Sequence, residues 1–109
     1  RTEAIQAATK YAIEIPYRVM QLTVDSFEII KAMALNGNPN SVSDAGVGAL
    51  CARSAVLGAY LNVKINAAGL KDKKFAEKIL SNSSEMAAKA KDLETAILDI
   101  VDEKILEMA

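Results

Sequence analysis

Apolar residues recur at helical spacing along almost the whole chain, and they predict three long helices. The first covers residues 2–35. Pro16 inside it removes a backbone donor and predicts a kink or a short break there. The second covers 42–68, and the third, 72–108, carries one apolar stripe near heptad spacing with its charges elsewhere. No segment alternates as a strand does. The sequence therefore predicts an all-α fold, a bundle of long antiparallel helices.

Turn and capping residues mark where the predicted helices end. The segment 36–40 is dense in Asn, Gly and Pro, residues that stop a helix and tolerate left-handed backbone geometry. Ser41 with Asp44 three residues later has the form of a capping box at the start of the second helix. Gly69 is a natural C-terminal cap for that helix. Asp72 or a neighbour is expected to cap the third helix.

The second predicted helix is almost uncharged. Arg53 is the only charged residue between Asp44 and Lys64, whereas a surface helix normally carries charge on its outward half. Most of this helix must therefore be covered on all sides. Gly48 and Gly58 each precede another small residue by four positions, where glycine is about 1 kcal/mol less favourable than alanine. We expect another backbone or a flat ligand to approach closely there.

Helical geometry at 100° per residue divides the second helix into two polar stripes. One stripe is small and polar along its whole length; its centre is formed by Asp44, Cys51, Ala55 and Asn62, and its edges by Gly48, Gly58 and Asn66. The other stripe, on roughly the opposite side, is formed by Arg53, Tyr60 and Lys64. Two separate polar stripes indicate that the helix does more than fill a core.

Each of these residues also has a purely structural interpretation. Asp44 can be a carboxylate stabilised by the dipole at a helix N-terminus. Asn62 and Asn66 can form hydrogen bonds between helices. Arg53 can pair with a carboxylate across an interface or bind a ligand, and both alternatives remain open. Cys51 is interpreted as a small core residue, because the chain has no histidine to activate it.

Composition excludes several classes of function. The formal net charge of −1 provides no basic field for nucleic acid, and an aromatic content of 5% provides few stacking platforms. The absence of histidine excludes Ser-His-Asp and Cys-His chemistry and His-ligated metal sites in this chain, and no metal site is expected. A single cysteine excludes an internal disulfide and suits a reducing, cytoplasmic environment. The polar start shows no signal peptide.

The apolar run 45–63 is long enough to span a bilayer. However, Arg53 lies at its centre, and no second apolar segment of this length occurs. A helix buried in a soluble oligomer fits better, so no membrane partner is expected.

The central segment resembles the cyclodeaminase/cyclohydrolase family. The resemblance rests on residues 37–47 (GNPNSVSDAGV), 53–55 (RSA) and 58–66 (GAYLNVKIN), and Pro16 also matches the family pattern. The family includes the cyclodeaminase part of formiminotransferase-cyclodeaminase and a bacterial methenyltetrahydrofolate cyclohydrolase. The resemblance implies an all-helical, dimer-forming fold, a homodimer, and one-carbon chemistry on a tetrahydrofolate derivative as the substrate.

The resemblance also implies that part of the domain is missing. Family members are about twice this length, and their N-terminal half carries a Gly-Gly-Gly-Ser stretch that does not occur here. Residues 1–109 are therefore expected to be the C-terminal half of one domain, with the N-terminal half as a partner. The implied function is hydrolysis of 5,10-methenyltetrahydrofolate to 10-formyltetrahydrofolate. The alternatives are cyclodeamination of formiminotetrahydrofolate with release of ammonia, or a non-catalytic helical dimerisation element.

The family motif places the candidate site on particular residues of this chain. Asp44 is the expected catalytic carboxylate, because both reactions benefit from stabilising a cation and moving a proton. The expected substrate-binding residues are Asn38, Asn40, Ser43, Arg53, Asn62, Lys64 and Asn66. Among them the asparagines would hydrogen-bond a pterin edge, and Arg53 or Lys64 would attract the glutamate tail.

Overall fold

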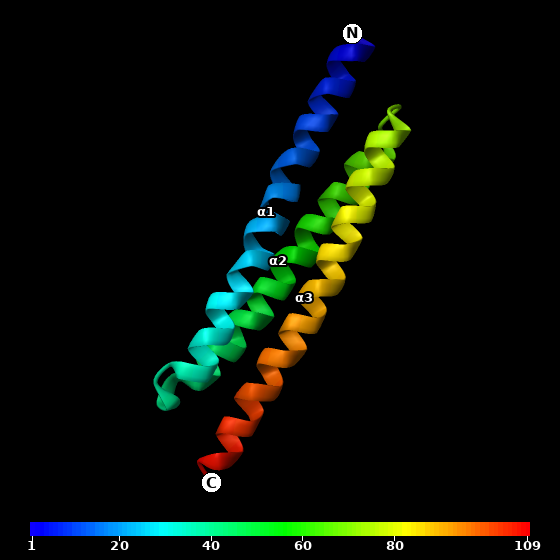
Figure 1. The fold of residues 1–109 in the computed structure, drawn as a ribbon. Coiled ribbons are helices and arrows are strands. Elements are labelled where there is room, and N and C mark those ends of the chain that lie inside the picture. Colours follow the sequence, from blue (N-terminus) through cyan, green and yellow to red (C-terminus); the bar gives the residue numbers. More distant parts are fainter.

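Three long helices and one short turn make up the structure, a computed structural model that describes all 109 residues (Figure 1). The elements are α1 (Thr2–Asn36), the 3₁₀ turn η1 (Pro39–Ser41), α2 (Val42–Ala68) and α3 (Lys73–Glu107). Figure 1 shows that consecutive helices run in opposite directions, and the molecule measures 63 × 17 × 16 Å. The all-α class and the three helix ranges are confirmed to within one or two residues, and no strand is present.

Helix α1 passes through Pro16 without interruption, so the predicted break there is wrong. Ile13 and Met20, on either side of Pro16, are both completely buried in the same core. A proline inside a helix costs about 3 kcal/mol, and burying two such side chains offsets a comparable amount. Because proline has no N–H, the carbonyl of Ala12 has no donor from the next turn.

The turn between α1 and α2 is capped differently from the sequence prediction. Ser41 makes no side-chain capping hydrogen bond, so the predicted capping box is wrong. Instead, the N–H of Asn40 donates to Asn38 Oδ1 at 3.0 Å and begins η1. No residue of the turn adopts the left-handed backbone that its glycine and asparagines would tolerate. Glycine is needed at position 37 for another reason: a Cβ at Gly37 would lie 2.5 Å from the carbonyl oxygen of Met33.

The core lies where one side of α2 meets α1 and α3. Its completely buried larger side chains come from all three helices and from the α2–α3 turn: Phe27, Ile13, Met20, Leu70, Ile97, Val56, Val63 and Ser83. Helix α3 covers only one side of the α1–α2 pair. The other side of that pair is therefore left uncovered by this chain.

The close approach predicted at Gly48 and Gly58 is absent within the chain. A Cβ at Gly58 would meet nothing within 4 Å, and one at Gly48 would meet only Ile30 Cγ2 at 4.0 Å. The glycine of α2 that packs most closely is Gly46, where a Cβ would lie 3.4 Å from Val101 Cγ1 of α3, at the short end of ordinary van der Waals contact. Gly58 therefore gives up helix stability without any packing gain inside the chain.

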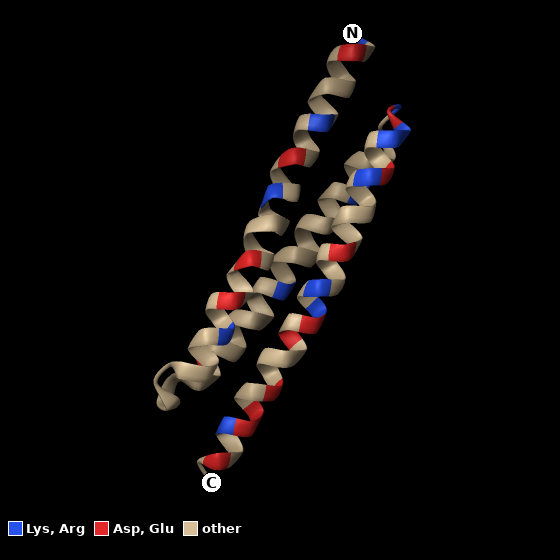
Figure 2. Cartoon of the chain, in the orientation of Figure 1, with Lys and Arg blue, Asp and Glu red and all other residues tan.

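Large apolar side chains remain exposed along α1 and α2. We call this surface the apolar face; it consists of Ile5, Ile15, Val19, Leu22, Ile29, Met33, Val47, Leu50, Leu57, Leu61 and Ile65. Figure 2 shows that the charged residues lie mostly on α1 and α3, whereas α2 is nearly free of charge. The apolar outward side of α2 is the main departure of this structure from an ordinary surface helix.

By length and composition, the stretch Pro39–Ala68 is apolar enough to cross a membrane. Only 28% of its most apolar 18-residue segment is buried within the chain. This is weak support for a membrane span, since the core helix of a globular protein passes the same test.

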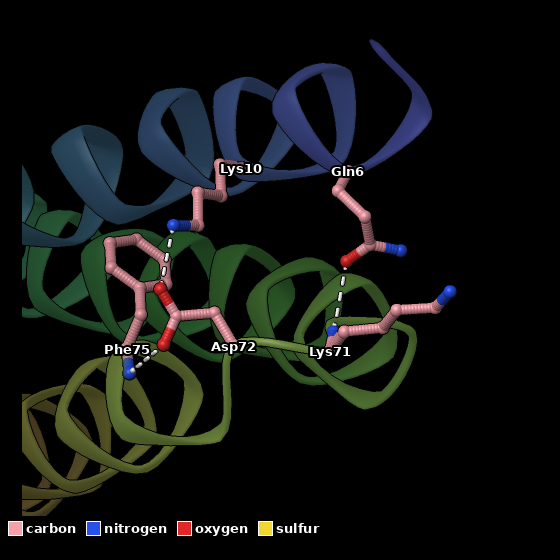
Figure 3. A network of polar contacts seen from close by, with 5 residues as sticks. All are labelled: Gln6, Lys10, Lys71, Asp72 and Phe75. Carbon is pink, nitrogen blue, oxygen red and sulfur yellow. Dashed lines mark hydrogen bonds and ion pairs between the residues drawn. The ribbon is translucent and has the colours of Figure 1, made fainter. Parts of the chain in front are cut away.

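A small polar network joins the beginning of α1 to the α2–α3 turn (Figure 3). Lys10 Nζ donates to Asp72 Oδ2 at 2.8 Å, and the N–H of Phe75 donates to Asp72 Oδ1 at 3.2 Å, which confirms Asp72 as the cap of α3. The N–H of Lys71 donates to Gln6 Oε1 at 2.9 Å. These contacts fix the N-terminal third of α1 against the turn.

The ion pair at Asp72 predicts a pH-dependent stability. The Lys10 hydrogen bond, and then the Phe75 N–H, lower the pKa of Asp72 from 3.8. Because the folded pKa lies below the unfolded one, the stabilisation is complete above about pH 4 and is lost as the pH falls through the folded value. We predict that Asp72→Asn, which keeps an acceptor for the cap, melts below wild type at neutral pH. The two melting temperatures should converge in strong acid.

The matched control is Asp92→Asn, which removes an exposed carboxylate of α3 that has no ion pair. It should not change the pH dependence. A difference between wild type and Asp72→Asn that stays constant from neutral to strongly acidic pH contradicts this role of the ion pair.

Ser83 predicts a stabilising substitution. Its Oγ is completely buried and forms no hydrogen bond. A buried hydroxyl without a partner loses hydration that nothing replaces, so Ser83→Ala should raise the free energy of unfolding by about 1–2 kcal/mol in chemical denaturation. Ser84→Ala, at an exposed position of α3, controls for helix propensity and should contribute only about 0.5 kcal/mol. Equal effects at both positions contradict the prediction.

Candidate functional site

A groove runs between α1 and α2 on the side away from α3, and it widens into two clefts. The first cleft has a volume of about 340 Å³ and lies where α1 ends and α2 begins. It is lined by Ile29, Ile30, Met33, Gly37, Asn38, Ser41, Asp44, Ala45 and Gly48. One wall is therefore apolar and comes from α1, and the other is polar and comes from the turn and the first turns of α2.

Asp44 is the only charged residue that lines either cleft of the groove. It is exposed in the first turn of α2 and forms no ion pair or hydrogen bond through its side chain. The carboxylate lies at the positive end of the helix dipole of α2, where a negative charge is stabilising. An unpaired carboxylate beside an apolar wall is suited to bind a flat cation.

Asn38 faces the same cleft from the turn. Its Oδ1 already accepts the N–H of Asn40, which fixes the side chain and leaves the Nδ2 group as a donor. Asn40 and Ser43 are exposed close by, but they do not line the cleft. The turn thus brings Asn38 and Asp44 together, as the sequence predicts, whereas Asn40 acts through its backbone.

The second cleft lies further along the groove and has a volume of about 750 Å³. It is lined by Tyr11, Ala12, Ile15, Pro16, Val19, Ala55, Ala59, Asn62 and Asn66. Asn66 Nδ2 donates to the carbonyl of Asn62 at 2.9 Å, so this bond lies within α2 and not between helices. Pro16 leaves the carbonyl of Ala12 without its helical donor. The cleft therefore offers the Asn62 amide and a backbone acceptor among apolar side chains.

Arg53 and Lys64 lie outside both clefts. Arg53 Nη1 pairs with Glu94 Oε1 of α3 at 3.2 Å, and the two side chains are only 20% and 17% exposed. The ammonium group of Lys64 lies 4.3 Å from the centre of the Tyr60 ring. Of the two alternatives for Arg53, the structure shows the ion pair, and it lies between α2 and α3 of the same chain.

Asn62 and Asn66 do not form one site with Asp44 within a single chain. Asp44 and Asn62 are separated by 18 residues of continuous helix, or about 27 Å along its axis. One pterin ring cannot contact both. The stripe of small polar residues is present, but its two ends belong to different clefts.

Sequence reasoning missed part of the site and misplaced Cys51. The α1 wall of the first cleft was not anticipated, because Ile29 and Met33 have the spacing of ordinary core residues. In the sequence, the only sign of this wall was that the apolar stripe of the first helix is wider than one neighbouring helix can cover. Cys51, interpreted as a core residue, is exposed. No group of three or more potential metal ligands comes together.

Comparison with known proteins gives the family. The profile described as Formiminotransferase-cyclodeaminase matches residues 1–85, which include the whole groove. The chain belongs to this family.

The similarity of the chain to individual proteins agrees with this family assignment. The chain is 35% identical over 105 residues to the methenyltetrahydrofolate cyclohydrolase of Methylorubrum extorquens, covering 96% of this chain and 50% of that protein. It is 32% identical over 104 residues to the formimidoyltransferase-cyclodeaminase of Dictyostelium discoideum, covering 95% of this chain and 19% of that protein. The protein of the same name from Gallus gallus is 30% identical, with the same coverage of 95% and 19%. The chain thus spans about half the length of the first relative and about a fifth of the others.

The Arg53–Glu94 pair predicts a strongly coupled pair of substitutions. Glu94→Gln leaves the guanidinium without its counter-charge, and Arg53→Met leaves the carboxylate unpaired. Each single variant should therefore lose about 1–3 kcal/mol of unfolding free energy. The double variant should lose clearly less than the sum, because neither charge remains. Chemical denaturation of the four proteins measures the coupling, and additive losses contradict the pairing.

Proposed function

We propose that this chain forms the folate-binding part of an enzyme of one-carbon metabolism that hydrolyses 5,10-methenyltetrahydrofolate to 10-formyltetrahydrofolate. Membership of the family and the similarity to the Methylorubrum extorquens cyclohydrolase support the substrate class. The observation that carries the proposal is Asp44, the one unpaired charge in a groove with an apolar wall.

The chemistry requires a carboxylate near a cation. The substrate carries positive charge on the amidinium carbon between N5 and N10, and water must add to this carbon. The Asp44 carboxylate stabilises that cation and accepts a proton from the attacking water. The carboxylic acid then returns this proton to N5 as the bond between the tetrahedral carbon and N5 breaks. The hydroxyl group on that carbon loses its own proton to solvent and becomes the carbonyl of the formyl group on N10. One proton is released overall, since the substrate is a cation and the product is not.

The first cleft offers binding groups suited to this substrate. Ile29, Ile30 and Met33 form an apolar wall for a flat ring, and the Nδ2 group of Asn38 can donate to a ring oxygen or nitrogen. Arg53 has no place in this proposal, because its guanidinium is bound to Glu94 on the α3 side.

A second candidate is cyclodeamination, in which the same five-membered ring closes on N5-formiminotetrahydrofolate and ammonia leaves. The relatives of Dictyostelium discoideum and Gallus gallus carry this name. Both reactions pass through a carbon bonded to two nitrogens, so the same carboxylate serves either. The two are distinguished with the natural-length protein: hydrolysis removes the absorbance of methenyltetrahydrofolate, whereas cyclodeamination produces that absorbance and releases ammonia from the formimino compound. If the protein shows neither activity, the non-catalytic dimerisation element is the remaining hypothesis.

Asp44→Asn separates a catalytic from a capping role. Asparagine keeps the shape of the side chain and removes only its charge, so the melting temperature should stay within a few degrees of wild type. Turnover in the natural-length protein should fall by at least about a hundredfold, the lower end of general acid–base contributions.

The matched control is Asp102→Asn, which removes an exposed carboxylate of α3 that lines neither cleft. It should leave turnover and melting temperature unchanged. Normal turnover in a well-folded Asp44→Asn protein would show that the role of Asp44 is only structural.

A further inference from the structure

The last turns of α3 lie next to the turn that carries Asn38 and leads to Asp44 (Figure 1). Lys104 Nζ donates to the backbone carbonyl of Leu35 at 2.6 Å, a contact between residues 69 positions apart in the sequence. Leu35 is the residue before Asn36, where α1 ends. Lys104 forms no ion pair, although α3 carries carboxylates close to it in the sequence. The ammonium group therefore joins the C-terminal part of α3 to the end of α1.

The end of α1 lacks such a partner within its own helix. The last four carbonyls of a helix have no donor in a following turn, and they form the negative end of the helix dipole. In α1 the carbonyl of Met33 accepts the N–H of Gly37, but the last turn contains no basic residue. Lys104 supplies a cation and donates to a carbonyl there. It therefore stabilises the helical conformation of the residues just before the turn at 37–41.

The same part of α3 also supports the start of α2. Gly46 is buried two residues after Asp44. A Cβ at Gly46 would lie 3.4 Å from Val101 Cγ1 and 3.7 Å from Leu98 Cδ2. Val101 and Lys104 are three residues apart, so they lie on the same face of α3. This face of α3 thus holds both ends of the turn at 37–41, and it lies beyond residues 1–85, the part of the chain that matches the family profile.

The two walls of the first cleft depend on this turn for their relative position. The apolar wall belongs to the last turns of α1, whereas Asp44 belongs to the first turn of α2. Only the short turn connects them, so loosening the end of α1 moves the apolar wall and Asn38 relative to the carboxylate. The cleft therefore keeps its geometry only while the end of α1 stays fixed.

We propose that Lys104 is a positioning residue for the candidate site: through the Leu35 carbonyl it fixes the end of α1, and thereby the position of the apolar wall relative to Asp44. Lys104 does not line the first cleft, so it acts through the backbone and not on the substrate. The structural part of this proposal stands on the contacts within the chain. Only the effect on turnover rests on the proposed function.

Hydrogen–deuterium exchange of the natural-length protein tests the structural part. Lys104→Met keeps the length of the side chain and removes its charge and its donors. Amides of residues 34–41 should then exchange about fivefold faster, the change expected when a local opening equilibrium loses one hydrogen bond. Lys104→Arg, which keeps a cation that can donate, should restore the slow exchange.

The matched control is Lys91→Met, which removes an exposed lysine of α3 that forms no ion pair. It should leave exchange at residues 34–41 unchanged. Lys104→Met itself should leave the α2–α3 turn at 69–72 unchanged. Wild-type exchange at 34–41 in Lys104→Met, or equal acceleration in Lys91→Met, overturns the proposal.

Turnover distinguishes a positioning role from a merely structural one. With methenyltetrahydrofolate, the kcat of Lys104→Met should fall about tenfold while KM changes less than about threefold, because the ring still binds but the carboxylate is misplaced. Lys104→Arg should restore most of kcat. In the Asp44→Asn background Lys104→Met should cause little further loss, since Lys104 acts through the position of Asp44. A merely structural role would lower the melting temperature and leave the kcat of the folded protein unchanged.

The outcomes separate this proposal from the proposed function. If the wild type is active and Lys104→Met has a normal kcat, Lys104 is not a positioning residue and the proposed function stands. The same holds if Lys104→Met lowers kcat by as large a factor in the Asp44→Asn background as in the wild type. If the wild type hydrolyses no folate, while exchange at 34–41 responds to Lys104→Met and not to Lys91→Met, the proposed function fails and the support of the turn by α3 stands.

Discussion

The near absence of charge on α2, with apolar side chains on both its inner and its outer side, is the constraint on which the rest of the structure depends. Its inner side, with Val56 and Val63 completely buried, forms the core with α1 and α3. Its outer side carries Leu61 and Ile65 at high exposure, a position where a surface helix normally bears charge. A bundle of only three helices cannot cover both sides. The fold therefore leaves an apolar face, a kind of surface that marks interaction sites.

The same constraint determines the electrostatics of the groove. The one arginine within α2 is bound to Glu94 on the opposite side, which leaves Asp44 as the only charge lining the two clefts. A single carboxylate among apolar and amide groups is suited to a flat, positively charged ring. The turn at 37–41 positions this carboxylate, because Asn38 and Gly37 close the end of α1 within a few residues of the start of α2.

Local features were predictable from the sequence, and features set by tertiary contacts were not. Helical periodicity located all three helices, and Asp72 was recognised as a cap because capping acts over three residues. Pro16 failed as a predictor of a break, since packing of Ile13 and Met20 keeps the helix continuous. The division of the stripe between two clefts also escaped prediction: helical angles place Asp44 and Asn62 on one face, but they do not show which α1 residues lie opposite each.

Hydrogen–deuterium exchange of the natural-length protein, with and without a bound tetrahydrofolate derivative, tests most directly the central claim that the α1–α2 groove is the folate site. The turn at 37–41 and the first residues of α2, up to position 45, border the first cleft beside Asp44. The account predicts that folate slows exchange in this turn and leaves the α2–α3 turn at 69–72 unchanged. Slower exchange at 69–72 or in α3, with none at 37–45, would contradict it.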